Sequence, residues 1–399
     1  MPSRLKEFFR LFRSRYPIAR GAGVNIRAAH RNPACVGIAF LLISAIEIDI
    51  VGAQSQCNNC TITLKPRTVL AGPVRGSDLD RSGVVAVMSQ GQYIVSIDKG
   101  TGLAVFDAEG KAVRTIGTRG NGPGEFQSIS SISVGRNDSI FVFEARRRIL
   151  QVFARDFRYV RQALLPLASK QIVPLSDGRV VTSGFARTQS GAGFPLHISG
   201  AHDGKILRSF GAEIAIFGPA NPGTLNHVVT ADRSGRLWSA SMNRYAITAW
   251  APNLETSREI VRAEDWFIPW SAPPKGFIDV EKPQTQLIDL AVGDSNELTV
   301  LFSVPAVNWK PAAQPFDIAT VPASQIPLEY LEKNLDSRIQ IVDAVRNTVI
   351  GSAYVGEQLS RLIAPRIAIR VRETAQGFVE VMVFDLVLTA EKKRSVEYN

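Results

Sequence analysis

The sequence predicts an all-β protein, a six-bladed β-propeller with a short N-terminal export segment. Three observations support this fold class. Short apolar runs bounded by turn residues recur from residue 60 onward, and long amphipathic helical patterns are scarce. One sequence pattern repeats along the chain, and a series of hairpin turns follows a similar spacing. Repeats of roughly 40–50 residues with about four strands each are typical of propellers.

The repeat is visible when residues 105–117 are aligned with residues 201–211. Both segments carry glycine, lysine, arginine and glycine at equivalent places, at an offset of 94 residues, which is twice 47. Residues 152–161 give a further copy halfway between them, and residues 249–254 and 341–346 give weaker copies. The spacing therefore predicts one blade for every 47 residues or so.

Six short hairpin turns count the blades. Each contains Asn, Asp, Ser or Gly, the residues that tight hairpins need, and each joins two apolar runs. They lie at Ser89–Gly91, Arg136–Asp138, Ser176–Gly178, Arg233–Gly235, Asp294–Asn296 and Thr374–Gly377. The last blade is incomplete at the C-terminus, and a strand near Arg67–Leu70 is expected to complete it and close the ring.

A glycine-rich crossover organises the first half of the repeat. Four glycines and a proline in residues 117–126 cannot form a strand, so this segment is expected to be a fixed turn between blades. We expect Glu125 to hydrogen-bond the amides of its own loop and Phe126 to anchor it. The segment Gly120-Asn-Gly-Pro-Gly-Glu-Phe126, followed by the strand-like runs 138–143 and 149–153, resembles the NHL-type six-bladed propellers of bacterial secreted proteins.

This resemblance is sharp over residues 80–165, fair to residue 262 and only architectural afterwards. It implies a propeller fold in an exported protein. The chain departs from the pattern in two ways: it keeps a single GxGPGEF crossover, and it carries long, Pro-rich insertions at 263–285 and 304–336.

The N-terminus is typical of an export signal. In residues 1–53 a basic region precedes the apolar run 34–46, which is shorter than the ~20 residues that span a bilayer. Cleavage is expected near Ala53; an uncleaved anchor or a misassigned start site are the alternatives. The domain plan is then a linker at 54–66, the propeller at 67–390 and a tail at 391–399. The expected location is periplasmic or extracellular.

Two cysteines remain after such a leader. Cys57 and Cys60 form a CxxC motif that could close a small disulfide in an oxidising compartment, or could be two idle thiols. A strand-like run follows them instead of a helix, which argues against a redox-active motif, and one CxxC cannot complete a zinc site.

The formal charge of +10 limits the function classes. About half of this excess lies in residues 1–53, so the body of the chain is only mildly basic. A dedicated nucleic-acid-binding role is therefore not expected. We also expect no cofactor, a monomer, and membrane contact only through an uncleaved N-terminal anchor.

Loop lengths indicate where a binding site would lie. With the four strands of each blade lettered A to D from the channel outward, A–B and C–D loops share one face. B–C loops and the D–A crossovers share the other. The long segments 117–126, 184–194, 263–285 and 304–336 all belong to the second face. Function on repeat scaffolds collects where loops are elaborated, so this face is the predicted binding face.

Candidate ligand-binding residues come from these loops. The basic and amide candidates are Arg119, Arg146, Arg147, Arg148, Arg187, Asn243 and Arg244. Clustered arginines would favour an anionic ligand; the alternative is that they are solvated loop charges. Trp266 and Trp270 could form a stacking platform for a sugar or peptide, or could pin an insertion to the scaffold.

Signatures of catalysis are thin. Some NHL-type propellers, the amidating lyases, hold a channel metal through histidines, but here His197 and His202 are expected away from the channel. His227 begins an inner strand and is a channel candidate or a structural histidine. We therefore predict no metal site and no catalytic residues.

The leading hypothesis is a non-catalytic exported propeller that binds a peptide, glycan, small anionic ligand or partner protein. The alternatives are a lyase or hydrolase acting in the channel, and a structural envelope module.

Overall fold

The computed structural model describes residues 60–167, 169, 171–184, 192–212, 214–215, 227–270, 282–310 and 328–390. The chain divides into two units, Met1–Gln54 and Ser55–Asn399, and every described residue lies in the second. The predicted export segment 1–53, Cys57, Arg187 and the tail 391–399 lie outside the described residues. Within the described ranges, no helix is long and apolar enough to span a bilayer.

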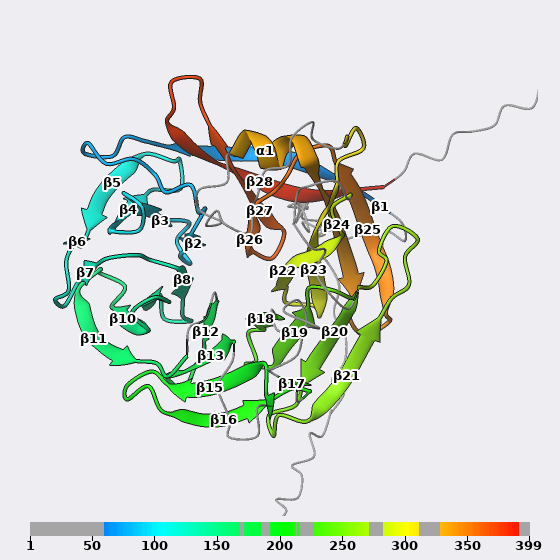
Figure 1. Ribbon diagram of the computed structural model, residues 1–399, viewed down its shortest axis with the longest axis horizontal. Helices are drawn as coiled ribbons and strands as arrows, with labels where there is room; N and C mark the ends of the chain where they lie inside the picture. The colour runs from blue at the N-terminus through cyan, green and yellow to red at the C-terminus, as the bar shows by residue number, and fades with distance from the viewer. Residues whose placement is uncertain are drawn as a thin grey trace, which may run out of the picture. The chain divides into compact units, whose positions relative to one another are not determined.

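The described residues form a ring of six four-stranded antiparallel blades, as predicted (Figure 1). Blade 1 contains β2 (Val85–Val87), β3 (Tyr93–Ile97), β4 (Gly102–Phe106) and β5 (Ala112–Ile116). Blade 2 contains β8 (Ser131–Val134), β9 (Ile140–Glu144), β10 (Ile149–Phe153) and β11 (Tyr159–Leu164). Blade 3 contains β12 (Ile172–Pro174), β13 (Arg179–Ser183), β15 (Leu196–Gly200) and β16 (Ile206–Phe210). Blade 4 contains β18 (His227–Ala231), β19 (Leu237–Ser241), β20 (Ala246–Trp250) and β21 (Thr256–Val261).

Blades 5 and 6 are joined into one eight-stranded sheet. Blade 5 contains β22 (Gln286–Val292), β23 (Glu297–Pro305), β24 (Leu335–Asp343) and β25 (Thr348–Val355). Blade 6 contains β26 (Arg361–Ala364), β27 (Ile367–Glu373), β28 (Val379–Thr389) and, from the other end of the chain, β1 (Cys60–Ala71). The first strand of each blade lies nearest the channel, and the fourth lies at the rim (Figure 1).

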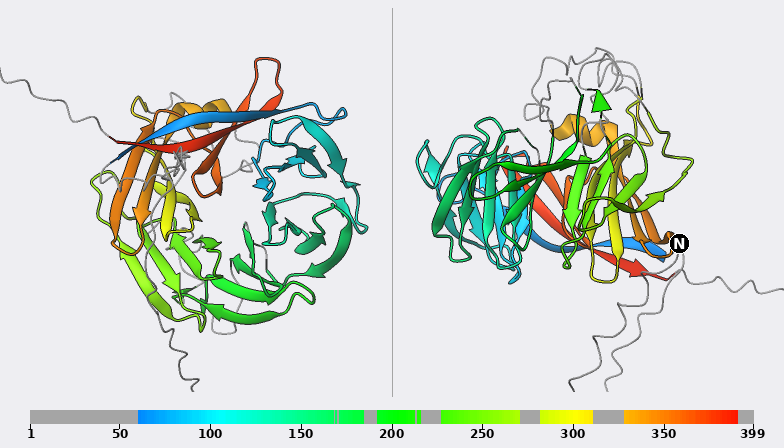
Figure 2. Two further views of the ribbon diagram at one scale, coloured as in Figure 1. Left: turned by 180° about the vertical axis from the view of Figure 1, so that it is seen from behind. Right: turned by 90° about the horizontal axis from the view of Figure 1, so that it is seen from below.

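Strand β1 closes the ring, as the incomplete last blade predicts. It pairs antiparallel with β28 from Thr61↔Thr389 to Ala71↔Glu380, and the two lie side by side in Figure 2. At its start it also pairs in parallel with β25, at Cys60↔Gly351, which merges the two blades. The strand is longer than expected, because residues 60–66, assigned to a linker from the sequence, form its first half.

The core lies between neighbouring blades. The two middle strands of blade 1, β3 and β4, are buried at every residue because the adjacent blades cover both of their faces, whereas the outer strand β5 is exposed or half-buried. At the closure, Leu70 of β1 is fully buried in a cluster that contains Val381 of blade 6 together with Tyr93 and Phe106 of blade 1. The N-terminal strand therefore contributes to the core as well as to hydrogen bonding.

One predicted turn is placed wrongly. Five of the six predicted hairpin turns join the first and second strands of a blade, but Thr374–Gly377 joins β27 to β28, the second and third strands of blade 6. The A–B turn of that blade is the two-residue connection Pro365–Arg366, where Arg366 adopts a φ of +56°. This turn is not recognisable from the sequence, because a left-handed φ is usually adopted by Gly, Asn or Asp, and this turn contains Pro and Arg.

The two faces of the ring differ strongly in loop length. In the described part of the fold, A–B and C–D connections have two to five residues, and we call this side the short-turn face. The other side, the long-loop face, holds the strand ends that are joined by the long connections 117–130, 184–195, 211–226, 262–285 and 306–334. They include the two-residue strands β6 (Thr118–Arg119), β7 (Glu125–Phe126), β14 (Ala192–Gly193) and β17 (Ile214–Ala215) and the helix α1 (Leu328–Asn334).

Helix α1 lies on one side of the disc of sheets, as the right-hand view of Figure 2 shows. Arg370 of β27 holds it there. Its guanidinium binds Glu332 of the helix at 3.0 Å and also pairs with Glu357 of the crossover into blade 6. The end of the insertion is thereby tied to the closing blade.

We expect Leu70→Ala to lower the free energy of unfolding by about 2–5 kcal/mol, because it leaves a cavity at the closure of the ring. Val69→Ala is the matched control: Val69 neighbours Leu70 on the same strand but is 41% exposed. Its effect should stay below about 1 kcal/mol. Urea unfolding of both variants measures the difference, and equal losses would show that β1 is not packed as described.

Candidate functional site

The crossover 117–126 is fixed by hydrogen bonds. As expected, Glu125 serves its own loop: its Oε2 accepts from the amide of Gly122 at 2.8 Å. Gln151 of β10 holds the other side, because its Oε1 accepts from the Gly124 amide at 2.8 Å and its Nε2 donates to the Glu125 carbonyl at 2.7 Å. Gly117 is required here, because a Cβ at that position would meet the Phe126 ring at 2.4 Å. The crossover is therefore a rigid platform.

A buried ion pair joins this platform to the B–C loop of blade 2. The Glu144 side chain is fully buried, and its Oε2 accepts from the amides of Gln127 and Ser128 at 2.8 and 3.1 Å. Its Oε1 binds Nη1 of Arg147 at 2.9 Å, and Nη2 of Arg147 donates to the Asn121 carbonyl at 3.2 Å. The guanidinium of Arg147, a candidate ligand-binding residue, is thus already bound by groups of the protein itself.

The neighbouring arginines point outward. Arg119, Arg146 and Arg148 are exposed, and we call these three residues the arginine patch. Arg148 donates one long hydrogen bond, 3.3 Å, to the carbonyl of Pro166. Among the described residues, Arg119 and Arg146 form no ion pair. Because Arg147 contacts Asn121, loop 145–148 packs on the crossover, and both of these segments belong to the long-loop face.

The second group of candidates holds the insertion 262–285 against blade 4. Asn243 is buried; its Nδ2 donates to the carbonyl of Trp270 at 2.6 Å, and the Trp270 amide donates back to the Asn243 carbonyl. Nε1 of Trp270 donates to the carbonyl of Thr285 at 3.0 Å, which ties the end of the insertion to its beginning. Arg244 is exposed and lies 3.7 Å from Glu259.

Trp266 is packed in the same way. Its ring lies edge-on to Phe302 at 4.9 Å, its Nε1 donates to Glu264 at 3.2 Å, and the guanidinium of Arg338 lies 4.8 Å above it. Of the two alternatives for the tryptophans, these contacts favour pinning of the insertion. The candidates therefore separate into a blade 2 group and a blade 4 group, and Arg187 belongs to the part of the chain that is not described.

The histidines are dispersed. His197 is buried in β15, where Nδ1 lies 2.8 Å from the Ser209 hydroxyl and Nε2 lies 3.1 Å from the Gly184 carbonyl. Burial lowers the pKa of this imidazole, so it is neutral at physiological pH. His202 lies in a C–D turn and His227 begins β18. Within the described ranges, no group of three or more His, Cys, Asp or Glu is placed to hold a metal ion.

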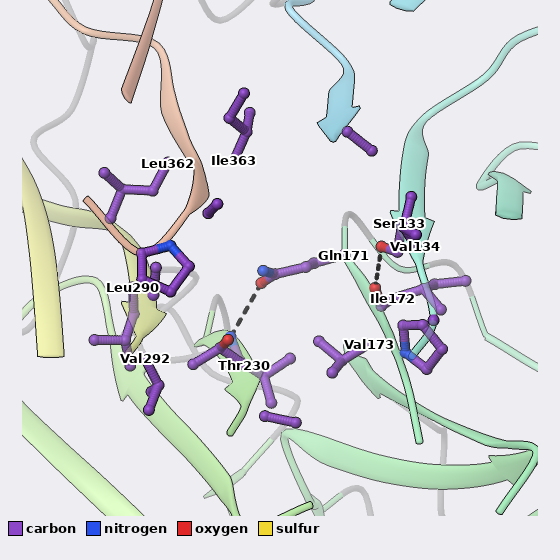
Figure 3. Close-up of a pocket in the computed structure, with 18 of the residues that line it drawn as sticks. Ser133, Val134, Gln171, Ile172, Val173, Thr230, Leu290, Val292, Leu362 and Ile363 are labelled. Atoms are coloured by element: carbon purple, nitrogen blue, oxygen red, sulfur yellow. Dashed lines mark hydrogen bonds between the residues drawn. The ribbon is translucent and has the colours of Figure 1, made fainter. Parts of the chain in front are cut away.

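A cavity of about 370 Å³ occupies the channel. The inner strands β2, β8, β12, β18, β22 and β26 all line it, and Figure 3 shows side chains from five of these blades converging on it. Its lining extends to turn residues such as Arg136, Ser176 and Arg233, so it lies toward the short-turn face. None of the predicted site residues, His227 included, lines this cavity.

Side chains bridge neighbouring inner strands around the channel. The hydroxyl of Ser133 in blade 2 donates to the Ile172 carbonyl in blade 3, and Oε1 of Gln171 accepts from the Val229 amide in blade 4 at 3.0 Å (Figure 3). In blade 5, Oδ2 of Asp289 accepts from the Leu362 amide in blade 6 at 2.9 Å. In these three places a backbone group of an inner strand is satisfied by a side chain of the preceding blade.

Asp289 is the buried carboxyl of the channel wall. A β-bulge between Leu287 and Asp289 turns it toward blade 6, where Arg361 lies 3.8 Å away. Burial raises the pKa of this carboxyl, while Arg361 and the amides of Leu362 and Leu290 oppose that shift. Sequence reasoning missed Gln171, Asp289 and Arg361. The available signal was a single acid inside the apolar run 287–292.

Comparisons with known proteins agree with the fold. A family model described as a 6-bladed beta-propeller matches residues 82–192. A member of the DUF4221 family from Bacteroides vulgatus is similar in structure, with a TM-score of 0.57 and 9% identity over 83% of this chain and 99% of that one. A protein named as exported, from Bacteroides fragilis, has a TM-score of 0.51 and 13% identity over 82% of this chain and 95% of that one.

Virginiamycin B lyase from Staphylococcus aureus gives a TM-score of 0.42 and 11% identity over 82% of this chain and 100% of that one, a likeness that says nothing about chemistry. No curated protein matches the sequence at a significant level. The comparisons confirm the six-bladed propeller, and the narrower NHL-type resemblance stays a prediction.

Arg147→Ala should destabilise the fold by about 3 kcal/mol, because it leaves the buried Glu144 carboxylate without its cation. Arg146→Ala removes the same charge one residue away, from an exposed side chain, and should change the free energy of unfolding by less than about 0.5 kcal/mol. Chemical unfolding of the two variants measures this. A similar effect of both would mean that Glu144 does not depend on Arg147.

Asp289 should give the fold a pH dependence of known sign. Its pKa is raised on folding, so the folded protein holds this proton more tightly than the unfolded chain. Its contribution is therefore most favourable below the ordinary aspartate pKa of about 4 and is lost as pH rises through the raised value. Asp289→Asn removes this titration, so the stability of the unaltered protein relative to the variant should fall with increasing pH.

Urea unfolding from pH 4 upward tests this. Asp177→Asn is the control of opposite sign, because the hydrogen bond from Arg179 lowers the pKa of Asp177, and any contribution it makes is lost as pH falls. If the free energy of unfolding of the unaltered protein, relative to that of Asp289→Asn, rises with pH, the raised pKa of Asp289 is contradicted.

Proposed function

We propose that this protein is an exported, non-catalytic binding propeller whose long-loop face recognises an anionic ligand through the arginine patch. The ligand would be an acidic peptide, an acidic glycan or the acidic surface of a partner protein. The observation that carries the proposal is the exposure of Arg119 and Arg146 without acidic partners in the described structure, on a platform that hydrogen bonds hold rigid.

The rigidity of the platform is what makes the patch suitable for binding. Guanidinium groups bind carboxylate and sulfate in a bidentate manner, and affinity improves when the groups need little ordering on binding. The buried Glu144–Arg147 pair and the Gln151 bonds fix the backbone that carries Arg119, Arg146 and Arg148.

Export rests on separate observations. The leader in residues 1–53 has the composition of a signal, and one structurally similar protein is named as exported. Cys60, at the start of β1, is disulfide-bonded, which suits an oxidising compartment. The Cys57–Cys60 pairing, the monomeric state and the absence of a cofactor stay predictions, as does the precise mode of export.

The alternative hypothesis, a lyase or hydrolase in the channel, gains no support from the described residues. An enzyme needs several titratable groups within hydrogen-bond reach of one another. Here the channel carboxyl Asp289 is engaged by two amides and Arg361, and His227 is not among the residues that line the cavity. We therefore retain binding as the proposal.

The test compares two double variants with the same loss of charge, one on each face of the ring, at blade 2 and the crossover that leads into it. Arg119→Ala/Arg146→Ala removes two of the three arginines of the patch. Arg155→Ala/Arg158→Ala removes two exposed arginines at the C–D turn of blade 2. The probes are immobilised heparin and immobilised poly-glutamate. We expect the patch variant to lose about tenfold in affinity at low salt and the control to lose little.

A preference for heparin or for poly-glutamate would distinguish a glycan from a peptide ligand. Equal losses in the two double variants would show that retention reflects overall charge, and would refute the arginine patch as a binding site.

A further inference from the structure

The channel cavity is a second candidate site, separate from the arginine patch. It opens among the A–B turns of the short-turn face, whereas the patch lies on the long-loop face. At about 370 Å³ it falls in the size range of pockets that hold small molecules. A ligand of this cavity would therefore be a different molecule, or a different part of a molecule, from the ligand proposed for the arginine patch.

The wall of the cavity combines polar groups with a set of incompletely covered aliphatic side chains. Val87, Val134, Val173, Leu175 and Ile363 line it and are only half-buried, although most aliphatic side chains of the blades are packed between sheets. Figure 3 shows Val134 and Val173 on one side of the space and Leu290, Leu362 and Ile363 on the other. Covering such side chains with an apolar ligand is favourable, because it removes apolar surface from water.

The backbone of the wall is less polar than a bare strand edge would be. The Ile172 carbonyl and the amides of Val229 and Leu362 are each taken by a side chain of the preceding blade. Three of the groups that would otherwise bind water in the channel are thus already satisfied. These backbone groups are therefore not available to a ligand rich in hydroxyls, such as a sugar, whereas the half-buried aliphatic side chains are available to an alkyl chain.

The charges available to a ligand are positive. Two acids line the cavity, and both are engaged: Asp289 by Arg361 and two amides, and Asp232 by the amides of Ser234 and Arg236. Arg233 at the mouth binds Asp294 at 2.9 Å. Arg136, also at the mouth, is exposed and has no ion pair within the described part of the chain. The charged group left for a ligand is therefore a guanidinium.

We propose that the channel cavity binds a small aliphatic carboxylate. Its chain lies against Val134, Val173 and Ile363, and its carboxylate faces the short-turn mouth, where Arg136 supplies the positive charge. Both parts follow from the wall: the aliphatic lining selects the chain, and the unpaired cation at one end selects the sign of the head group.

Calorimetric titration of the full chain with octanoate tests the proposal, with octylamine and acetate as comparisons. Octanoate should bind with one-to-one stoichiometry. Octylamine has the same chain with the opposite charge, and acetate has the charge without the chain, so each should bind at least tenfold more weakly. The proposal is overturned if octanoate shows no saturable binding, or if octylamine binds as tightly as octanoate.

Two variants with matched controls locate the site. Val173→Phe fills the channel and should weaken octanoate binding at least tenfold, whereas Val160→Phe adds the same bulk on the outer strand β11 and should have no effect. Arg136→Ala should weaken binding about three- to fivefold and Arg155→Ala should not. Binding that survives Val173→Phe unchanged overturns the site. If that variant does not fold, Val134→Phe replaces it, and the comparison of octanoate with octylamine on the unaltered protein decides independently.

Discussion

Ring closure is the constraint on which the rest of this structure depends. A blade exposes an apolar surface on both sides, so each blade must be covered by two neighbours, and the last must meet the first. Here β1 meets that need twice, since it completes blade 6 by pairing with β28 and packs Leu70 against blade 1. The channel, the two faces and the candidate sites described on them all depend on this closure.

Closure also explains why the two faces are so different. On the short-turn face the A–B turns of neighbouring blades bind one another: Ser89 donates to Asp138 at 2.9 Å, Arg233 pairs with Asp294, and Arg366 pairs with Glu297. A long insertion in one of these turns would break a contact between blades. The long-loop face carries the crossovers, whose length can vary without disturbing the pairing of strands, and elaboration is found there.

The repeated blades could be predicted from the sequence, but contacts between residues far apart in the chain could not. Buried middle strands and Gly- or Asn-containing turns leave local patterns, so the blades were predictable. Strand β1 was underestimated because Pro66 interrupts its pattern; the structure accommodates that proline beside a bulge, on a strand edge that β25 pairs only at Cys60 and Thr61. The contact between Asp289 and Arg361 joins residues far apart in the chain, and no local pattern encodes it.

In the run Arg146–Arg148, a residue of the scaffold and residues of the proposed site stand side by side in the sequence. The three side chains of this run are chemically identical, so their roles differ only through the contacts they make: the fully buried Glu144, three residues earlier in the chain, pairs with Arg147, which is half-buried, while Arg146 is exposed. Arg148 adopts a φ of +58°, which turns the chain into β10. The inward arginine thus fixes the backbone from which its neighbour projects. A loop that held its arginines without such an anchor would have to order them on binding, and would lose affinity for doing so.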